Sequence, residues 1–116
     1  MVDAASSISG EEFCGGIAGG SVGSGTVTFE NCGNEAKVYA NGANAAGIIG
    51  VSYLGNCNFN ITNCYNAGSI DGGRESAAIS GWVGGGSVIR NCYNAGNVSG
   101  MDGTNSLYRN TCTSSG

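Results

Sequence analysis

A phrase of four residues recurs three times in this chain of 116 residues, and the recurrence restricts the fold more than any other feature. Its copies, 32 and 28 residues apart, are Asn31-Cys32-Gly33-Asn34, Asn63-Cys64-Tyr65-Asn66 and Asn91-Cys92-Tyr93-Asn94. A second phrase, apolar-x-Gly, recurs every 31 residues at Ile17-Ala18-Gly19, Ile48-Ile49-Gly50 and Ile79-Ser80-Gly81. Periods of this length are typical of solenoids and propellers, in which each unit buries its apolar face against its neighbours.

The apolar residues inside each repeat form short alternating runs, which indicate strands with one buried face. Two sets hold equal places in successive repeats and are expected to stack as apolar rows: Phe29, Ile61 and Ile89, and Val38, Ile70 and Val98. Three strand signals per repeat, around Ile48, Ile61 and Ile70 in the second one, predict a coil with three faces. Gly and Asn suit the corners because both tolerate positive φ.

We predict an all-β fold, a parallel β-solenoid (β-helix) with about three full coils of about 30 residues and a partial fourth. A propeller blade needs about four antiparallel strands in some 40 residues, so single coils fit the shorter period better. The repeats occupy residues 14–112, and Ser106-Leu107-Tyr108 belongs to the partial fourth copy. Residues 1–13 form an N-terminal segment expected to cap the array, and residues 113–116 form a C-terminal tail.

The charges of the chain argue against two classes of partner. Four basic residues stand against eight acidic ones, and a net charge of −4 repels phosphate backbones and anionic headgroups. The longest apolar stretches, such as residues 45–51, are far shorter than the ~20 residues of a transmembrane helix. We therefore expect neither nucleic acid as a partner nor insertion into a membrane. Residues 1–13 lack the basic and apolar regions of a signal peptide, so any export signal is expected outside this sequence.

Three segments resemble the GLUG-type repeats of bacterial surface proteins: Gly16-Ile17-Ala18-Gly19, residues 63–70 (Asn-Cys-Tyr-Asn-Ala-Gly-Ser-Ile) and residues 91–100 (Asn-Cys-Tyr-Asn-Ala-Gly-Asn-Val-Ser-Gly). The resemblance covers nearly everything from Cys14 to Leu107. It implies a large secreted or wall-attached parent, such as an adhesin-like protein or the non-catalytic part of an immunoglobulin-cleaving metallopeptidase. The first repeat departs from the pattern at Gly33 and Glu35-Ala36, where the others carry Tyr and Ala-Gly, so its loop is expected to differ.

The chain has six Cys residues, which are the candidates for thiol chemistry, and it has no His. Cys32, Cys64 and Cys92 hold one repeat position, and we predict an inward column of buried thiols whose parallel side chains suit a disulfide poorly. In an exported protein the remaining three are the better candidates for one bridge, with one thiol left over. These three are Cys14, Cys57 and Cys112. No metal site is predicted, because the chain has neither Cys-x-x-Cys nor a His ligand.

The recurring Asn residues permit two interpretations. Asn31, Asn63 and Asn91 are aligned, and so is a second set, formed by Asn34, Asn66 and Asn94. Amides hydrogen-bond sugars well, so either set suits a ligand site. The structural interpretation is preferred, because stacked Asn side chains at a corner satisfy one another and the backbone of the turn. The predicted structural ladder consists of Asn31, Asn63 and Asn91.

Exposed aromatic residues are the remaining candidates for binding, because rigid rings grip sugars and proteins. Tyr65 and Tyr93 are expected to stack on one outer face, and Trp82 is expected near another corner. The competing interpretation is that a Tyr pair on neighbouring strands stabilises the sheet by up to ~1 kcal/mol without any ligand.

The residue pattern does not favour an enzyme. Catalysis on a β-helix needs clustered carboxylates, whereas Glu30 aligns with Thr62 and Arg90. Asp71-Gly72 and Asp102-Gly103 are predicted as turns. We therefore expect no cofactor and no catalytic residue, with a carbohydrate-active β-helix enzyme as the weaker alternative. Ice binding is set aside, because Thr26-Val27-Thr28 is not repeated in the later coils.

The sequence thus predicts a non-catalytic repeat module of a bacterial surface protein, located outside the cell, that acts as a structural stalk or an adhesion region. The alternative is an adhesin that binds a host glycan or host protein through its exposed Tyr face. Neighbouring repeats of the parent protein are the expected partners. Exposed strand edges at the ends of the array also predict pairing of the chain end to end.

Overall fold

The computed structural model describes residues 1–21, 25–52, 57–74, 76–83, 86–99 and 108–110. In these ranges every regular element is a β-strand, and all strand pairs are parallel. The predicted all-β class with parallel sheets is confirmed, and the arrangement is compatible with a β-helix. No helix that is long and apolar enough to cross a membrane occurs in this part of the chain.

The strands form four parallel sheets, each named here after one central member. The β5 sheet contains β1 (Ser7–Gly15), β5 (Lys37–Ala46), β9 (Ile70–Arg74) and β13 (Val98–Ser99). The β6 sheet contains β2 (Ala18–Ser21), β6 (Ile49–Ser52), β10 (Ser80–Val83) and β14 (Tyr108–Asn110). The β7 sheet contains β3 (Gly25–Glu30), β7 (Cys57–Thr62) and β11 (Val88–Arg90). The β8 sheet contains β4 (Gly33–Asn34), β8 (Tyr65–Asn66) and β12 (Tyr93–Asn94).

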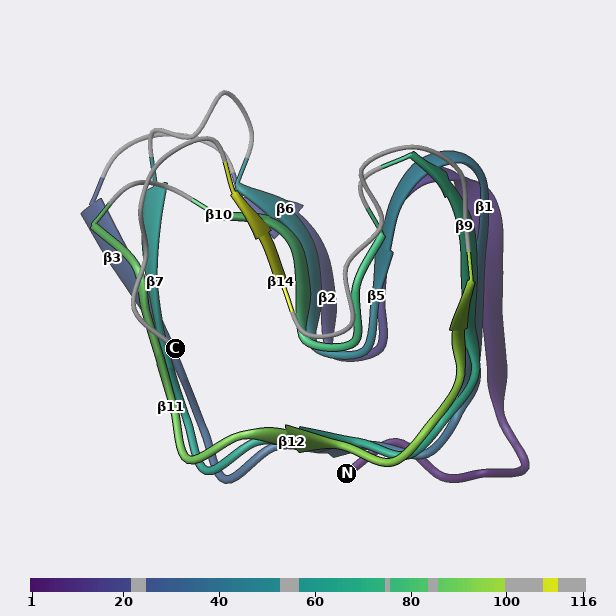
Figure 1. Ribbon diagram of the computed structural model, residues 1–116, viewed down its shortest axis with the longest axis horizontal. Coiled ribbons are helices and arrows are strands. Elements are labelled where there is room, and N and C mark those ends of the chain that lie inside the picture. The colour runs from purple at the N-terminus through teal and green to yellow at the C-terminus, as the bar shows by residue number, and fades with distance from the viewer. Residues whose placement is uncertain (22–24, 53–56, 75, 84–85, 100–107, 111–116) are drawn as a thin grey trace.

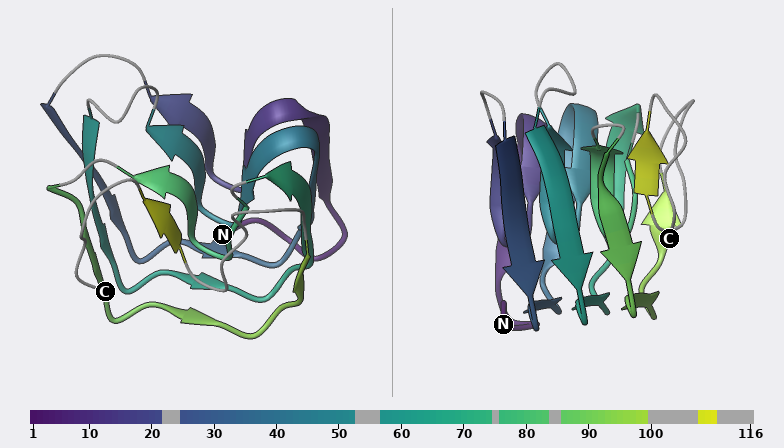
Figure 2. Two further views of the ribbon diagram at one scale, coloured as in Figure 1. Left: turned by 45° about the horizontal axis from the view of Figure 1, so that its top comes forward. Right: turned by 90° about the vertical axis from the view of Figure 1, so that its left-hand side faces the viewer.

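Consecutive strands lie in different sheets, and the chain returns to the same sheet at every fourth strand. Figure 1 shows the outline that results, with the β8 sheet along the lower side and the β7 and β5 sheets rising from its two ends. The side view in Figure 2 shows β3, β7 and β11 next to one another and pointing the same way. Strands paired in this way lie ~4.8 Å apart.

The prediction of three strands per repeat is wrong, because each repeat contributes to four sheets. The additional element is the two-residue strand of the β8 sheet, such as Tyr65–Asn66, which is too short to show an alternating pattern. The strand predicted around Ile48 is also displaced. Gly47 and Ile48 form the bend between β5 and β6, because the apolar run of residues 45–51 continues through this buried bend.

The β5 sheet bends over and runs back towards the β6 sheet (Figure 1). Its strand register shifts between Gly10 and Glu12 on β1 and between Ala40 and Ala43 on β5. Irregularities of this kind bend and twist a strand. The returning part packs closely on the β6 sheet, since a Cβ on Gly50 of β6 would meet backbone atoms of β1 and β5 in the returning part.

The predicted apolar rows are confirmed by the strand register. Phe29 pairs with Ile61 and Ile61 with Ile89, while Val38 pairs with Ile70 and Ile70 with Val98. The larger of two core clusters contains Phe29, Ile48, Ile49, Cys57, Phe59, Ile61, Cys64, Ala78, Ile79 and Ile89. The smaller contains Cys14, Val38, Ala40, Ala45 and Ile70. The fold of the β5 sheet towards the β6 sheet accounts for the division of the core into two clusters.

The N-terminal residues take part in the sheets. β1 begins at Ser7, so the boundary predicted between residues 13 and 14 falls inside a strand. Val2 forms a parallel bridge with Asn34 beside β4. Residues 112 and 113–116, which complete the predicted repeat region and tail, lie outside the described residues.

Candidate functional site

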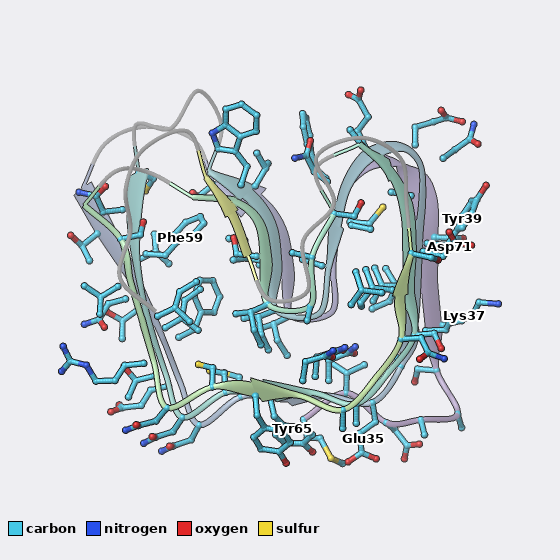
Figure 3. The ribbon with its side chains drawn as sticks, in the orientation of Figure 1. Glu35, Lys37, Tyr39, Phe59, Tyr65 and Asp71 are labelled. Carbon is cyan, nitrogen blue, oxygen red and sulfur yellow. The ribbon has the colours of Figure 1, made fainter. Side chains whose placement is uncertain are left out.

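The tyrosine pair lies on the outer face of the β8 sheet. Tyr65 and Tyr93 are paired in register, and their rings stack with centroids 5.3 Å apart and planes 10° from parallel. Figure 3 shows Tyr65 pointing away from the core, close to Glu35. Tyr93 is 60% exposed, whereas Tyr65 is only partly exposed. The ring of Tyr93 is therefore the larger aromatic surface that this face offers to a ligand.

Tyr65 is held in place by contacts in the preceding repeat. Its hydroxyl donates a hydrogen bond of 2.8 Å to Oε2 of Glu35. The carboxylate accepts from the neutral phenol, and this raises the pKa of Tyr65 above its ordinary value. Sequence reasoning gave Glu35 no role. The only available signal was that Glu35 stands where the later repeats carry Ala.

Trp82 does not join the tyrosine pair. It belongs to β10 of the β6 sheet, which lies opposite the β8 sheet in the view of Figure 1, and its side chain is partly buried. The three aromatic residues proposed for binding are therefore divided between two sheets.

A second exposed tyrosine, which the sequence interpretation missed, lies on the outer face of the β5 sheet (Figure 3). Tyr39 is 40% exposed, and its hydroxyl donates to Oδ1 of Asn41 over 3.2 Å. Asn41 in turn donates to both carboxylate oxygens of Glu11, over 3.2 and 3.3 Å. No repeat relates Tyr39 to another aromatic residue, since its partners in register are Ser9 and Asp71. The repeat pattern that indicated Tyr65 and Tyr93 therefore gave no indication of Tyr39.

An amide ladder, formed by Asn34, Asn66 and Asn94, runs through the interior behind the β8 sheet. Nδ2 of Asn34 donates to Oδ1 of Asn66 over 2.8 Å, and Nδ2 of Asn66 donates to Oδ1 of Asn94 over 2.9 Å. Each amide also donates to the carbonyl oxygen two residues further on, which belongs to Ala36, Gly68 and Gly96 respectively. Asn34 and Asn66 are fully buried. Their amides therefore serve the fold, as the structural interpretation expects.

The other Asn set lies at the corners that precede the β8 sheet. Asn31, Asn63 and Asn91 are exposed and have φ values of 57°, 56° and 54°. This left-handed conformation is one that Asn tolerates better than most residues, because its short side chain bonds locally. The set thus provides the turn between the β7 and β8 sheets, whereas the ladder predicted for it is formed by Asn34, Asn66 and Asn94.

The cysteine column lies next to these corners. Cys64 is 1% exposed, and its thiol donates to the carbonyl oxygen of Thr62 over 3.3 Å. Burial raises its pKa to about 11. Cys32 and Cys92 are partly exposed, and no disulfide joins the three residues. The expectation of buried thiols thus holds fully for the central member of the column.

The cysteines outside the column do not pair with one another where the structure describes them. Cys14 and Cys57 are both buried, and they belong to different core clusters. Cys14 lies in β1 of the β5 sheet and Cys57 in β7 of the β7 sheet. Cys112 lies outside the described residues.

The strand register at Glu30 is the one that the sequence predicts. Glu30 pairs with Thr62, and Thr62 with Arg90. The prediction of a turn at Asp71-Gly72 is wrong, because both residues lie in β9, where Asp71 accepts a hydrogen bond of 3.2 Å from Ser99. Asp102-Gly103 lies outside the described residues. Among the residues described, no three acidic, Cys or His side chains gather in a way that suits a metal ion.

Comparison of the chain with protein-family models, with curated proteins and with solved structures gave no match.

Proposed function

We propose that the chain is a parallel β-solenoid of three full coils and a partial fourth. The first coil runs from Val2 through β3, the second contains β4 to β7, the third contains β8 to β11, and β12 to β14 begin the fourth. Support comes from the return of the chain to the same sheet at every fourth strand. The bridge between Val2 and Asn34 supports the start of the first coil near the N-terminus.

The proposed function is that of a non-catalytic repeat module of a bacterial surface protein, which extends or presents other parts of its parent outside the cell. One observation carries the proposal. The polar residues that recur in the sequence are used between coils, as in the donation from Asn34 to Asn66 and from Asn66 to Asn94. A residue that recurs because each coil needs it for stacking indicates a scaffold. The location and the relation to GLUG-type repeats follow from the sequence resemblance and belong to the same proposal.

Two other functions have less support. A glycan- or protein-binding adhesin is favoured by the 60% exposed ring of Tyr93, but the hydroxyl of Tyr65 is already bonded to Glu35 and Trp82 lies in another sheet. A carbohydrate-active enzyme needs paired carboxylates, and the strand register instead places Thr62 beside Glu30.

A repeat insertion tests the scaffold proposal. A second copy of residues 33–64, inserted between Cys64 and Tyr65, restores the phrase Asn-Cys-Tyr-Asn at the junction and adds one coil. Each added coil contributes another stacking interface, so we expect the melting temperature to rise by several degrees. The matched control inserts a copy of residues 33–48 alone, which is half as long but displaces every later strand into the wrong sheet.

The solenoid predicts that the longer insertion is tolerated and that the shorter one lowers the melting temperature. If the shorter insertion is tolerated better, or if both are equally harmful, the solenoid proposal fails. Thermal unfolding followed by circular dichroism provides the measurement.

A binding screen separates the scaffold from the adhesin. The chain is tested against glycans and host matrix proteins alongside Tyr93→Ala, with Tyr39→Ala as the control because Tyr39 is exposed on a different sheet. An interaction with a glycan or matrix protein that is lost only in Tyr93→Ala would establish the adhesin, whereas the scaffold predicts no interaction with these ligands that depends on Tyr93.

A further inference from the structure

The amide ladder has a direction. Asn34 donates to Asn66 and Asn66 to Asn94, so every inter-coil bond of the ladder points from an earlier strand of the β8 sheet to a later one. A side-chain amide has two N–H donors. In Asn34 and Asn66 one donor bonds a local carbonyl oxygen and the other bonds the next Asn. In Asn94 the local bond to Gly96 is present, and within the described residues the second donor has no recorded acceptor.

The start of the ladder is closed. Val2 lies beside Asn34 in parallel, donating its N–H to the carbonyl oxygen of Gly33 over 2.9 Å and accepting from the N–H of Glu35 over 2.8 Å. Its apolar side chain has no amide to continue the ladder. One edge of the β8 sheet is therefore occupied by a residue that ends the pattern, and the other edge, at β12, presents a donor that continues it.

The residues around β12 are more exposed than their counterparts one repeat earlier. Asn66, Cys64 and Ile70 are at most 1% exposed. Their counterparts Asn94, Cys92 and Val98 are all partly exposed. The rows of residues that are buried in the earlier coils are thus partly exposed to solvent at the β12 edge.

The tyrosine pair ends at the same edge. A Cβ on Gly33 would overlap the ring of Tyr65, so this ring leans over the earlier strand β4. The ring of Tyr93 stacks in parallel on that of Tyr65 and is 60% exposed. Since the stack progresses from β4 towards β12, the exposed face of the Tyr93 ring belongs to the same edge as Asn94, whose second donor has no acceptor among the described residues.

We propose that the β12 edge binds an extended strand of sequence aromatic-Asn-x-Gly, in parallel register with Tyr93–Asn94. The aromatic ring of this strand stacks on Tyr93, and its Asn accepts from Nδ2 of Asn94. The backbone bonds follow the existing pattern, in which Tyr93 N–H donates to Cys64 and Ala95 N–H donates to Asn66. The incoming strand therefore donates to the carbonyl oxygens of Cys92 and Asn94. The partner is thus a further repeat of the kind this chain contains, and the inference depends on the proposed solenoid.

A second copy of this chain fits the edge less well. Its own closed edge presents Met1 and Val2 where the aromatic residue and Asn are required. This distinguishes the proposal from simple end-to-end pairing, which uses exposed strand edges without side-chain selection.

The test uses the full chain and a ¹⁵N-labelled synthetic peptide of residues 86–99, in which Cys92→Ser prevents disulfide formation. The control peptide also carries Asn94→Val, which reproduces the residue type found at the closed edge. We expect the first peptide to bind with its Tyr93 and Ala95 amides protected from exchange, and the control to bind about tenfold more weakly, which is the effect of one buried hydrogen bond. Tyr93→Ala in the protein is expected to weaken binding of the first peptide.

Exchange at Val38 and Ile70 of the protein, whose N–H groups bond Ser69 and Asn97, reports in the same sample whether the sheets are formed. If these amides are protected and the first peptide does not bind, or if both peptides bind equally, the inference is wrong. The proposed solenoid is unaffected by either result. Unprotected amides there overturn the proposed solenoid. Self-association of the chain that excludes the peptide, seen by analytical ultracentrifugation, identifies a second copy as the occupant and also overturns the inference.

Discussion

The ring of Tyr65 lies over the backbone of Gly33, in the space that a side chain at residue 33 would occupy. Gly33 precedes Tyr65 in strand register, in the row that continues with Tyr93. The absence of a side chain at this position lets the first tyrosine settle against the sheet and orients the ring on which the second one stacks. This explains structurally why the first repeat departs from the phrase of the later ones.

We therefore predict that Gly33→Ala displaces the Tyr65 ring and destabilises the chain by about 1–3 kcal/mol, the usual cost of overpacking. Urea unfolding monitored by circular dichroism measures the change. In the Tyr65→Ala background the space is already empty, so Gly33→Ala is expected to be nearly neutral there. Additive effects of the two substitutions would contradict the packing relationship.

The amide ladder is expected to be a main source of stability. Asn66→Ala removes the acceptor of Asn34 and both bonds that Asn66 donates. Leaving a buried donor without a partner costs about 1–3 kcal/mol, so we expect a loss of about 2–4 kcal/mol in the free energy of unfolding. Asn60→Ala is the control, because Asn60 is exposed on β7. Similar losses of unfolding free energy in both variants would show that the ladder stabilises the fold no more than an exposed Asn does.

The corner residues provide a test of backbone conformation. Asn63 has φ of 56°, where Gly is unstrained and Ala is disfavoured. We predict that Asn63→Gly changes stability by less than about 0.5 kcal/mol and that Asn63→Ala lowers it by about 1 kcal/mol. Equal thermal stability of the two variants would argue that side-chain contacts, and not φ, select Asn at this position.

Cys64 makes stability depend on pH in the alkaline range. Its pKa in the folded chain is about 11, raised from 9.0 by burial, so between these values the folded state holds a proton that the unfolded state releases. The contribution is fully present below pH 9 and is lost as the pH rises towards 11. Denaturant unfolding from pH 8 to 11 is expected to show a decline in stability that is shallower in Cys64→Ala. An unchanged slope in this variant would mean that other groups cause the decline.

The same pKa predicts low reactivity of the Cys64 thiol. Because the thiolate is the reactive form, alkylation at pH 8 is expected to modify the partly exposed Cys32 and Cys92 well before Cys64. Mass spectrometry of peptides after timed iodoacetamide treatment measures the order. Early modification of Cys64 in the folded chain would contradict its burial.

Much of the register could be predicted from the sequence, because residues that stack in neighbouring repeats share a chemical type. Phe29 and Ile61, Val38 and Ile70, and Tyr65 and Tyr93 all pair as their spacing predicts. The number of sheets could not be obtained in this way. The strands of the β8 sheet have two residues each, and a period of two is not visible in a pair of residues.

The tertiary structure also assigned the roles of residues that the sequence treats alike. The two Asn sets recur with the same period, yet they have different roles. One set adopts the left-handed conformation at the exposed corners, and the other lies in the strands of the β8 sheet, where it forms the ladder. The partnership of Glu35 with Tyr65 joins residues that belong to different repeats and share no pattern.

The sequence by itself determined the period, the all-β class, the parallel pairing of like residues and the rows of the core. Periodic burial of side chains leaves its record directly in the order of residues. Only the tertiary structure decided that each repeat contributes to four sheets, that the β5 sheet folds back and divides the core, and that the amide ladder begins beside Val2 and runs in one direction to Asn94. These features depend on bends and directions in space, which residues far apart in the chain define together and no local spacing encodes.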